Sequence, residues 1–295
     1  MHIFLTGGTG FVGSAVLRRL TAADHQVTAL VRSDDAAAKV TAAGATALIG
    51  DITDIAWLTP KIAVTDGAVH TASPGDATSQ AVDSAVATAA TAAFAGTGKP
   101  YVHTGGIWVY GNGAVITEET PLDPPALTAW RPEVERIALG AEGVRGVVVV
   151  PAVVYGHGGG IPNVISGAER TESGAPFLIG DGTQHWTTVH VDDLADLYVR
   201  ALEDSRADGH YIGSDGRNPT VRELGEAASR ASGGGGSVRP ATAQDARARL
   251  GELFADALLL SQQAAATRAR TELGWKPSRP SLVEELETGS YAPKK

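Results

Sequence analysis

The sequence predicts an α/β fold, a doubly wound parallel sheet with a smaller C-terminal lobe. Short apolar runs alternate with helix-like segments up to about residue 155. A glycine-rich segment joins the first apolar run to the first helix, and from about Gly156 the pattern breaks into glycine- and proline-rich loops. Such alternation is typical of parallel strands whose two faces are covered by helices.

The glycine-rich segment at residues 6–13 follows the first apolar run, at 3–5, and its glycines are spaced G-x-x-G-x-x-G. Glycines at this spacing let the chain turn tightly and let a pyrophosphate approach the helix N-terminus. A second strand-like run, at 26–31, completes a βαβ unit and favours a dinucleotide site over a plain glycine-rich turn. The segment supplies the first expected cofactor contacts, Gly7, Thr9, Gly10, Phe11, Val12 and Gly13.

The end of the second strand indicates which dinucleotide is bound. A fold that selects NAD usually places Asp or Glu there, where the carboxylate binds the ribose 2′-hydroxyl. This chain has Arg32 and Ser33 instead, and a guanidinium with a neighbouring hydroxyl suits a 2′-phosphate. The alternative is that Arg32 is an ordinary surface charge. We expect NADP(H) as the cofactor.

The remaining elements follow from the same alternation. Six strands are expected, at residues 3–5, 27–31, 47–49, 67–70, 101–103 and 147–150. Four helices are expected between them, at residues 13–21, 36–43, 79–96 and 132–140. The third of these helices is mostly Ala, Val and Thr, with Asp83 as its only charge. Because it is apolar nearly all round, we expect the sheet and a second body to cover it, and a homodimer would supply that body.

The pattern divides the chain into two parts. Residues 1–155 form the predicted NADP-binding Rossmann domain, and residues 183–215 return to it with a helix that begins near Asp192 and Asp193. Residues 156–182 and 216–295 form the predicted substrate-binding lobe. The glycine-rich stretch at 232–237 joins two elements within this lobe.

Composition excludes several classes of protein. The 295 residues are 43% hydrophobic and 19% charged, which is ordinary for a globular enzyme. A net charge of -9 argues against a nucleic-acid partner. The chain has no cysteine, its eight histidines lack the paired spacing of a zinc site, and we expect no metal. No apolar run approaches the ~20 residues of a membrane helix, so we expect a cytoplasmic protein without a membrane partner.

Landmarks along the whole chain resemble the extended and atypical short-chain dehydrogenase/reductase superfamily, the branch of NAD(P)-dependent epimerases, dehydratases and reductases. They lie at residues 6–13, 50–52, 70–73, 101–106, 109–111, 151–156, 190–193 and 269–275. The resemblance implies that Asp51 and Ile52 contact the adenine. It implies that Thr71, Ala72 and Ser73 contact the middle of the cofactor, and that Val153 and Val154 contact the nicotinamide.

The sequence differs from this family at the positions of the residues that transfer a proton. Members that transfer hydride usually carry Ser or Thr after the fifth strand and Tyr-x-x-x-Lys on the next helix, where the tyrosine exchanges the proton and the lysine lowers its pKa. The aligned positions here hold Gly106, Leu127 and Arg131. The chain's Tyr-x-x-x-Lys, from Tyr291 to Lys295, lies in a tail that we expect to fray, so we interpret it as a coincidence.

Four residues are candidates for catalysis in place of that set. Thr104 closes the fifth strand, and Arg131 does not deprotonate but could hold the ribose or a substrate oxygen. Both are also expected to contact the cofactor. Tyr155 and His157 follow the sixth strand, at the edge of the sheet where ligands bind, and an imidazole titrates near neutrality. Each candidate has a structural alternative as a strand, packing or surface residue.

Together these features predict an NADP-dependent oxidoreductase. We expect a reductase that delivers hydride from NADPH to a small carbonyl, imine or activated alkene, with an atypical proton donor. Trp108 and Trp130 flank the place of the missing tyrosine and would form an apolar wall for an aromatic or lipophilic substrate. Two alternatives stay open, a non-catalytic NADP(H)-binding sensor or partner module and a non-redox isomerase or cyclase.

Overall fold

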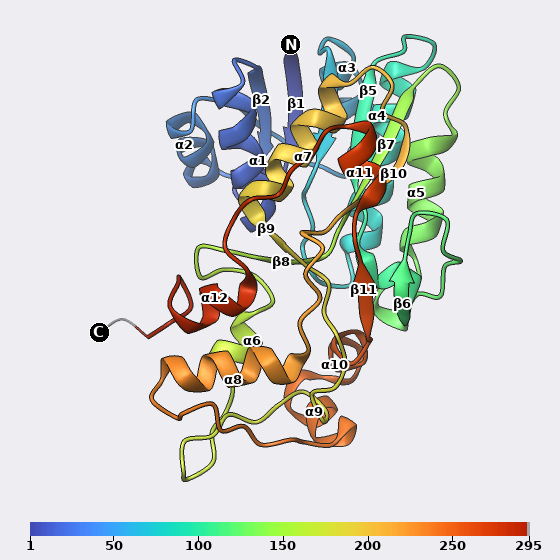
Figure 1. The fold of residues 1–295 in the computed structure, drawn as a ribbon. Coiled ribbons are helices and arrows are strands. Elements are labelled where there is room, and N and C mark those ends of the chain that lie inside the picture. Colours follow the sequence, from blue (N-terminus) through green and yellow to red (C-terminus); the bar gives the residue numbers. More distant parts are fainter. Residues whose placement is uncertain (294–295) are drawn as a thin grey trace.

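The computed structural model describes residues 1–293. At its centre lies a seven-stranded parallel sheet in the order β10-β7-β5-β4-β1-β2-β3 (Figure 1). Its strands are β1 (His2–Thr6), β2 (Gln26–Val31), β3 (Thr46–Ile49), β4 (Gly67–His70), β5 (Pro100–Thr104), β7 (Arg145–Pro151) and β10 (Gly209–Gly213). The predicted α/β fold with a doubly wound parallel sheet is confirmed, and the six expected strands all belong to this sheet.

Helices cover both faces of the sheet (Figure 1). They are α1 (Phe11–Ala22), α2 (Asp34–Ala42), α3 (Ile55–Ala63), α4 (Ser79–Phe94), α5 (Arg131–Gly140) and α7 (Val191–Glu203). The sequence pattern did not indicate α3, because Pro60 lies inside it and a proline usually interrupts a helix. Among residues 1–293, no helix combines the length and the apolar character needed to cross a bilayer.

The apolar helix α4 finds its cover within the same chain. It packs against β4 and β5 and lies between α3 and α5. Ala89 and Phe94 are fully buried in this arrangement. The composition of α4 therefore requires no second subunit to explain it.

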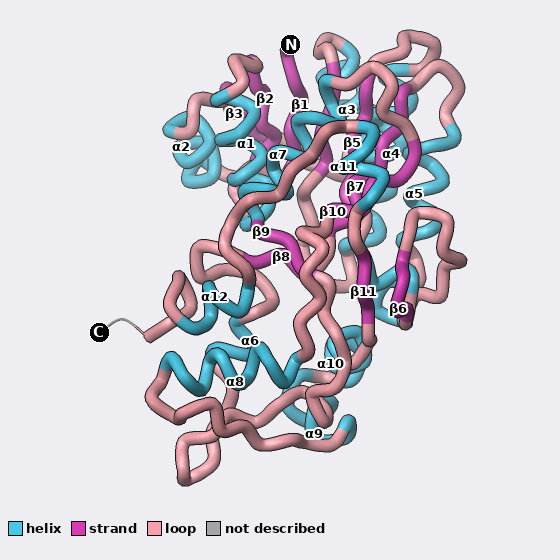
Figure 2. Tube along the Cα trace, in the orientation of Figure 1, coloured by secondary structure: helices cyan, strands magenta, loops and turns pink. Residues whose placement is uncertain are grey.

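The smaller lobe lies beyond the carboxyl ends of the central strands (Figures 1 and 2). Its helices are α6 (Asn163–Ser166), α8 (Val221–Ala231), α9 (Ala243–Leu250), α10 (Glu252–Leu258) and α12 (Leu282–Glu287). It has a core of its own, to which Trp186, Leu224 and Leu286 belong. Two short parallel ladders lie between the lobe and the sheet, β8 (Val153–Tyr155) with β9 (Thr188–His190) and β6 (Gly113–Ile116) with β11 (Gln262–Ala264).

Later segments of the chain return to the larger part. β10 extends the central sheet beside β7, and α7 packs on α1. Helix α11 (Thr267–Glu272) packs on β10, and Trp275 is buried in the main core with its Nε1 donating to the carbonyl of Asp193 at 2.8 Å. Residues 267–275 thus lie against the sheet, whereas the sequence pattern placed them in the substrate-binding lobe.

The segment around Tyr291 differs from expectation. Tyr291 is only 9% exposed and belongs to the core of the smaller lobe. Its hydroxyl accepts a hydrogen bond from the amide of Gly156 at 2.8 Å and donates to the carbonyl of Gly159. The expectation that this residue lies in a fraying tail is therefore wrong, and Lys295 lies outside the described residues.

Candidate active site

The turn after β1 is packed so closely that two of its positions, Gly7 and Gly13, have no space for a side chain. Gly7 has φ +78°, and a Cβ there would lie 2.5 Å from the backbone nitrogen of Ala72, just past the end of β4. A side chain at Gly13 would collide with the carbonyl oxygen of Gly7. These two glycines allow the turn and bring the end of β4 and the start of α1 against it.

The N-terminus of α1 is suited to an anion. Its N-cap, Gly10, makes no side-chain cap, and the first turn holds no acidic residue. The amide of Ser14 bonds back to the carbonyl of Gly10 at 2.9 Å, so the amides of residues 11–13 precede the helical ladder and are available to a ligand. A pyrophosphate fits such a group of amides at the positive end of the helix dipole.

The parallel sheet brings most of the other expected cofactor residues to the same edge, because all its strands end there. Arg32 is exposed after β2, and within residues 1–293 no carboxylate lies within ion-pair distance of it. Ser33 accepts from the amide of Ala36 at 3.3 Å and so caps α2. After β3, the amide and hydroxyl of Thr53 donate to Asp51 and lower the pKa of its carboxyl. Of the remaining expected contacts, Ile52, Thr71, Ala72 and Ser73 follow β3 and β4 at this edge, whereas Val153 and Val154 lie in β8, which pairs with β9 outside the central sheet.

A cleft of about 740 Å³ opens beside the ends of β4, β5 and β7. The larger part contributes Ser73, Gly106 and Ala152, and the smaller lobe contributes Leu253 and Phe254. Aromatic and aliphatic side chains dominate its walls, namely Trp108, Trp130, Phe254, Leu127, Ile161 and Leu253. The expected apolar wall at Trp108 and Trp130 thus lies on this cleft.

Arg131 is fixed at the inner end of the cleft. Its Nη1 donates to the carbonyls of Thr104 and Gly105, at 3.2 and 3.1 Å, and its guanidinium lies 4.8 Å from the ring centroid of Trp130. The Nη1 is also 3.9 Å from a carboxylate oxygen of Asp83. The side chain therefore lies against the end of β5, with the rest of its N–H groups left for a ligand.

A buried polar chain leads from Arg131 back to the glycine-rich turn. Asp83, on α4, accepts from Nε2 of His70 at 3.0 Å, and Nδ1 of His70 bonds the hydroxyl of Thr6 at 2.7 Å. All three side chains are at least 97% buried. Thr6 immediately precedes Gly7, so one connected network touches both the turn and the cleft.

The hydroxyl of Thr104 is already engaged. It donates to the carbonyl of His70 at 2.5 Å and bonds the hydroxyl of Tyr198, from α7, at 2.7 Å. Burial raises the pKa of Tyr198. Thr104 does not line the large cleft, so its contacts favour the structural alternative over proton transfer.

Tyr155 lies in the core of the smaller lobe and is fully buried. Its hydroxyl donates toward the carboxylate of Asp215 at 3.0 Å and the carbonyl of Pro280 at 2.7 Å. Burial and the nearby Asp215 carboxylate raise its pKa. The structure does not bring Tyr155 to the cleft.

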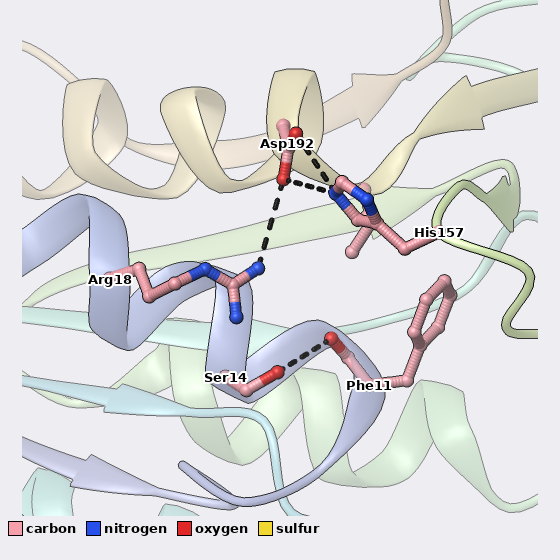
Figure 3. Close-up of a pocket in the computed structure, with 6 residues that line it drawn as sticks. Phe11, Ser14, Arg18, His157 and Asp192 are labelled. Atoms are coloured by element: carbon pink, nitrogen blue, oxygen red, sulfur yellow. Dashed lines mark hydrogen bonds and ion pairs between the residues drawn. The ribbon is translucent and has the colours of Figure 1, made fainter. Parts of the chain in front are cut away.

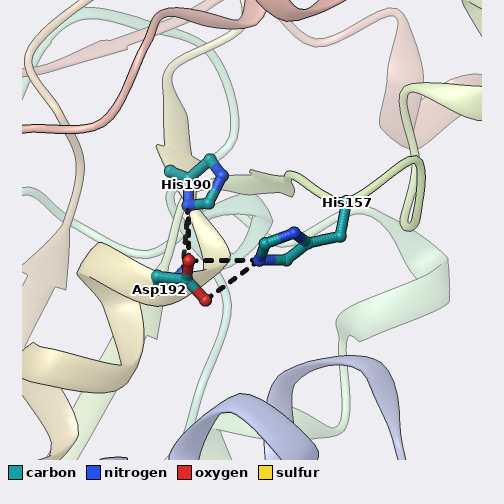
Figure 4. A group of neighbouring side chains, drawn as sticks. All are labelled: His157, His190 and Asp192. Atoms are coloured by element: carbon teal, nitrogen blue, oxygen red, sulfur yellow. Dashed lines mark hydrogen bonds and ion pairs between the residues drawn. The ribbon is translucent and has the colours of Figure 1, made fainter. Parts of the chain in front are cut away.

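His157 lies in a separate pocket of about 430 Å³, between α1 and the start of α7 (Figure 3). Its Nε2 is 3.1 Å from both carboxylate oxygens of Asp192, and Arg18 approaches the same carboxylate at 3.8 Å (Figure 3). The ring of His190 also lies by Asp192, with Nδ1 3.9 Å from Oδ2 (Figure 4). Although these three residues have the spacing of metal ligands, Arg18 and Arg279 already pair with the carboxylate.

The residues that replace the family's usual catalytic set lie together on the cleft. Helix α5 begins at Arg131, so Leu127 lies one turn earlier, in a short 3-10 helix (Ala126–Thr128). Gly106, Leu127 and Arg131 all line the cleft. Among residues 1–293, the ionisable groups that line it are Arg131 and Asp76, and the bonds from Thr78 lower the pKa of Asp76. Neither is a proton donor near neutral pH.

Sequence reasoning did not find every residue of the site. The role of Asp83 was hidden, although a lone carboxylate in an otherwise apolar helix was a signal that it needs buried partners. Leu253 and Phe254 carried no such signal, because only the fold places α10 across from Trp108. The rings of Trp108 and Phe254 meet edge to face, with centroids 6.2 Å apart.

The fold and the glycine-rich turn define a nucleotide-binding α/β protein of the Rossmann type. Residues 3–212 match the model of the NAD dependent epimerase/dehydratase family. The chain belongs to this family, which confirms the resemblance stated from the sequence.

Three curated relatives match nearly the whole chain, and two of them illustrate the range. An uncharacterized protein of Schizosaccharomyces pombe is 31% identical over 99% of this chain and 100% of its own length. The 3-diazoavenalumate denitrifying reductase of a Streptomyces species is 26% identical over 97% of this chain and 99% of its own.

Solved structures share the fold at low identity. The human epimerase family protein SDR39U1, crystallised with NADPH, has a TM-score of 0.74 and 22% identity, and the match covers 98% of this chain and 99% of that one. The UDP-glucose 4-epimerase of Thermotoga maritima, crystallised with UDP-glucose, has a TM-score of 0.75 and 18% identity, with 98% and 97% covered.

Proposed function

We propose that this protein is an NADPH-dependent reductase that acts on a small carbonyl, imine or activated alkene. The observation that carries the proposal is the apolar cleft at the carboxyl ends of β4, β5 and β7, at the same edge of the sheet as the uncapped N-terminus of α1. In sheets of this type, ligands bind at that edge. A human structural neighbour was crystallised with NADPH, and a Streptomyces relative is a reductase by name. These two findings support NADPH as the cofactor and reduction as the reaction.

The residues of the site divide into cofactor and substrate groups. The amides of residues 11–13 would hold the pyrophosphate, and Arg32 with Ser33 would hold a 2′-phosphate. Arg131, at the position of the family's lysine, would donate to the ribose. The cofactor, when bound, supplies the hydride. The apolar walls exclude water and orient a flat acceptor, while Gly106 and Leu127 leave the cleft without the usual acid.

Gly10→Val tests the proposal. A Cβ at Gly10 would meet only the carbonyl oxygen of Gly7, at 3.3 Å, so the chain can fold while the side chain obstructs the phosphates. We expect NADPH binding to fall at least tenfold, and substrate-dependent loss of NADPH absorbance across a carbonyl, imine and alkene panel to disappear. Gly140→Val is the matched control, because no atom lies within 4 Å of a Cβ there. Tight NADPH binding without turnover of any acceptor would contradict the reductase.

A second function is favoured by one observation: among the described lining residues, the ionisable ones are Arg131 and an Asp76 whose pKa is lowered, so the usual tyrosine acid has no replacement there. On this alternative the protein is an NADP(H)-binding sensor without turnover. Calorimetry with NADPH and NADP⁺ separates the two. A sensor requires a large difference between the two affinities, because a ligand shifts a conformational equilibrium only through differential binding. Equal affinities would remove the sensing role.

A further inference from the structure

The lining of the cleft constrains the substrate class of the proposed reductase, on which this inference rests. At the lobe end the cleft is lined by Ile161, Leu253 and Phe254. Among residues 1–293, the only basic side chain that lines it is Arg131, which lies against the end of β5. A diphosphate-bearing substrate needs cations or clustered amides around its phosphates. The lobe end instead offers apolar surface, so the cleft does not suit a sugar nucleotide.

Carboxylates outnumber guanidinium groups at the cleft and directly behind it. Arg131 is paired with the buried carboxylate of Asp83 at 3.9 Å, and Asp76 adds an exposed carboxylate at the rim. His70 also contacts Asp83, through Nε2, and its Nδ1 bonds the hydroxyl of Thr6. Two carboxylates therefore stand against one guanidinium, in a chain whose net charge is -9. Such a field favours a cation over an anion in the cleft.

The aromatic side chains of the cleft also favour a cationic ligand. Trp108, Trp130 and Phe254 line the cleft, and Trp108 and Phe254 meet at an interplanar angle of 68°. Aromatic faces attract ligand cations through the ring quadrupole, most strongly where water is excluded. They also suit a flat, conjugated compound.

The ionisable side chains that line the cleft also bear on the type of acceptor. Reduction of a neutral carbonyl needs a proton on the product oxygen, and neither Arg131 nor the ionised Asp76 can donate one. Reduction of a C=N⁺ group does not. A hydride forms one C–H bond at the carbon, the π pair moves to nitrogen, and the acceptor becomes a neutral amine as the nicotinamide reductant is oxidised to its cation. Charge and electrons balance without a proton from the protein.

We propose that the cleft between Trp108, Trp130 and Phe254 binds flat, conjugated cations of the iminium type, and that these are the acceptors of the proposed reductase. Asp76 contributes to selectivity through its charge. The inference concerns binding as well as turnover, so it can be tested without the cofactor.

The binding test uses the full chain and three probes. N-methyl-3,4-dihydroisoquinolinium is the permanent cation, 1-tetralone is a neutral compound of similar bicyclic shape, and UDP-glucose represents the sugar nucleotides. Quenching of tryptophan fluorescence, checked by calorimetry, gives each Kd. We expect the cation to bind about tenfold more tightly than the ketone, and UDP-glucose to bind more weakly than both. Equal or tighter binding of the ketone or of UDP-glucose would overturn the proposal.

Asp76→Asn separates a site effect from general attraction to an acidic protein. The hydroxyl and amide of Thr78 bond Asp76, and those of Thr183 bond Asp181 in the same way, so Asp181→Asn is a matched control outside the cleft. We expect Asp76→Asn to weaken cation binding about threefold, as for an exposed charge near a ligand, and to leave ketone binding unchanged. An equal loss in both variants would show non-specific attraction and overturn the role of Asp76.

Turnover distinguishes this inference from the proposed function. The measurement is NADPH oxidation with each acceptor, corrected for the reaction without protein. Faster reduction of the cation supports both. Reduction of the ketone at equal or higher kcat/KM keeps the reductase and overturns the cation preference. Selective cation binding without any NADPH oxidation keeps the binding inference and contradicts the reductase.

Discussion

At the scale of single residues, Arg131 replaces the lysine of the family pattern and can still bind a ligand. It stands where the family pattern has lysine, and its Nη1 alone donates to the carbonyls of both Thr104 and Gly105. A guanidinium can make these contacts and still present further N–H groups, which a single ammonium does less well. It cannot lower the pKa of a tyrosine here, because Leu127 occupies that place.

We expect Asp83 to act on the cofactor through Arg131 as a positioning residue. Asp83→Asn keeps the shape but removes the charge near the guanidinium, so NADPH binding should weaken about tenfold, or ~1.4 kcal/mol. In an Arg131→Gln background the same change should have little further effect on Kd. Binding measured by calorimetry completes this double-mutant cycle. Additive effects of the two changes would show that Asp83 acts independently of Arg131.

Arg32 carries the predicted preference for NADPH over NADH. Arg32→Gln removes the charge that would meet a 2′-phosphate, so the Kd of NADPH should rise about tenfold while that of NADH stays the same. The control is Arg136→Gln, an exposed arginine that pairs with Glu133 on α5. If Arg32→Gln changes both Kd values equally, Arg32 does not discriminate between NADPH and NADH through the 2′-phosphate.

At the scale of elements, the start of α5 and the loop after β8 decide what reaches the cleft. The turn before α5 is a short 3-10 helix that places Leu127 on the cleft. The loop at 156–160 carries His157 away from it, to the carboxylate of Asp192. The sequence suggested that both Tyr155 and His157 lie at the ligand-binding edge because they follow the sixth strand of the sheet. In the structure β8 leaves that sheet and pairs with β9.

We expect Tyr291 to hold the loop at 156–160. Tyr291→Phe removes the bonds to the amide of Gly156 and the carbonyl of Gly159, and should lower the free energy of unfolding by about 1–2 kcal/mol. Amide exchange in residues 156–160 should become faster. Tyr211→Phe, which loses a bond to Glu272 elsewhere, is the control and should leave that exchange unchanged. Unaltered exchange in Tyr291→Phe would contradict the assignment.

At the scale of the whole molecule, the buried side chain of His103 makes stability depend on pH. His103 is buried among Tyr101, His70 and Arg131, and burial, with the nearby charges, holds its pKa well below the usual 6.5. In the native state it stays neutral, whereas the unfolded chain takes up a proton below pH 6.5. Its contribution is therefore present above that pH and lost as the pH falls.

The expected slope is about 1.4 kcal/mol of unfolding free energy per pH unit below the unfolded pKa. Urea unfolding at several values between neutral and moderately acidic pH measures it. His103→Gln removes the titrating group, so its stability, although lower overall, should fall less steeply. Parallel curves for the two proteins would show that His103 does not contribute.

Much of the fold could be read from the sequence because its signals are local. The strand runs, the turn at Gly7 and Gly13, and the helices α1, α2, α4 and α5 follow from spacing and conformational preference within a few residues. The helix α3 escaped because Pro60 gives the opposite local signal. The edge that gathers most of the expected cofactor residues was also predictable, since parallel strands end together.

Only the tertiary structure decided how the candidate residues are used. It buried Tyr155, paired His157 with Asp192, and joined Asp83 to Arg131, contacts between positions 35 to 60 residues apart. The cleft wall likewise combines Trp108 with Phe254. Local sequence determines backbone geometry and hence the place where a dinucleotide would bind. The chemistry beside it depends on side chains from distant segments, whose approach is set by packing of the whole chain.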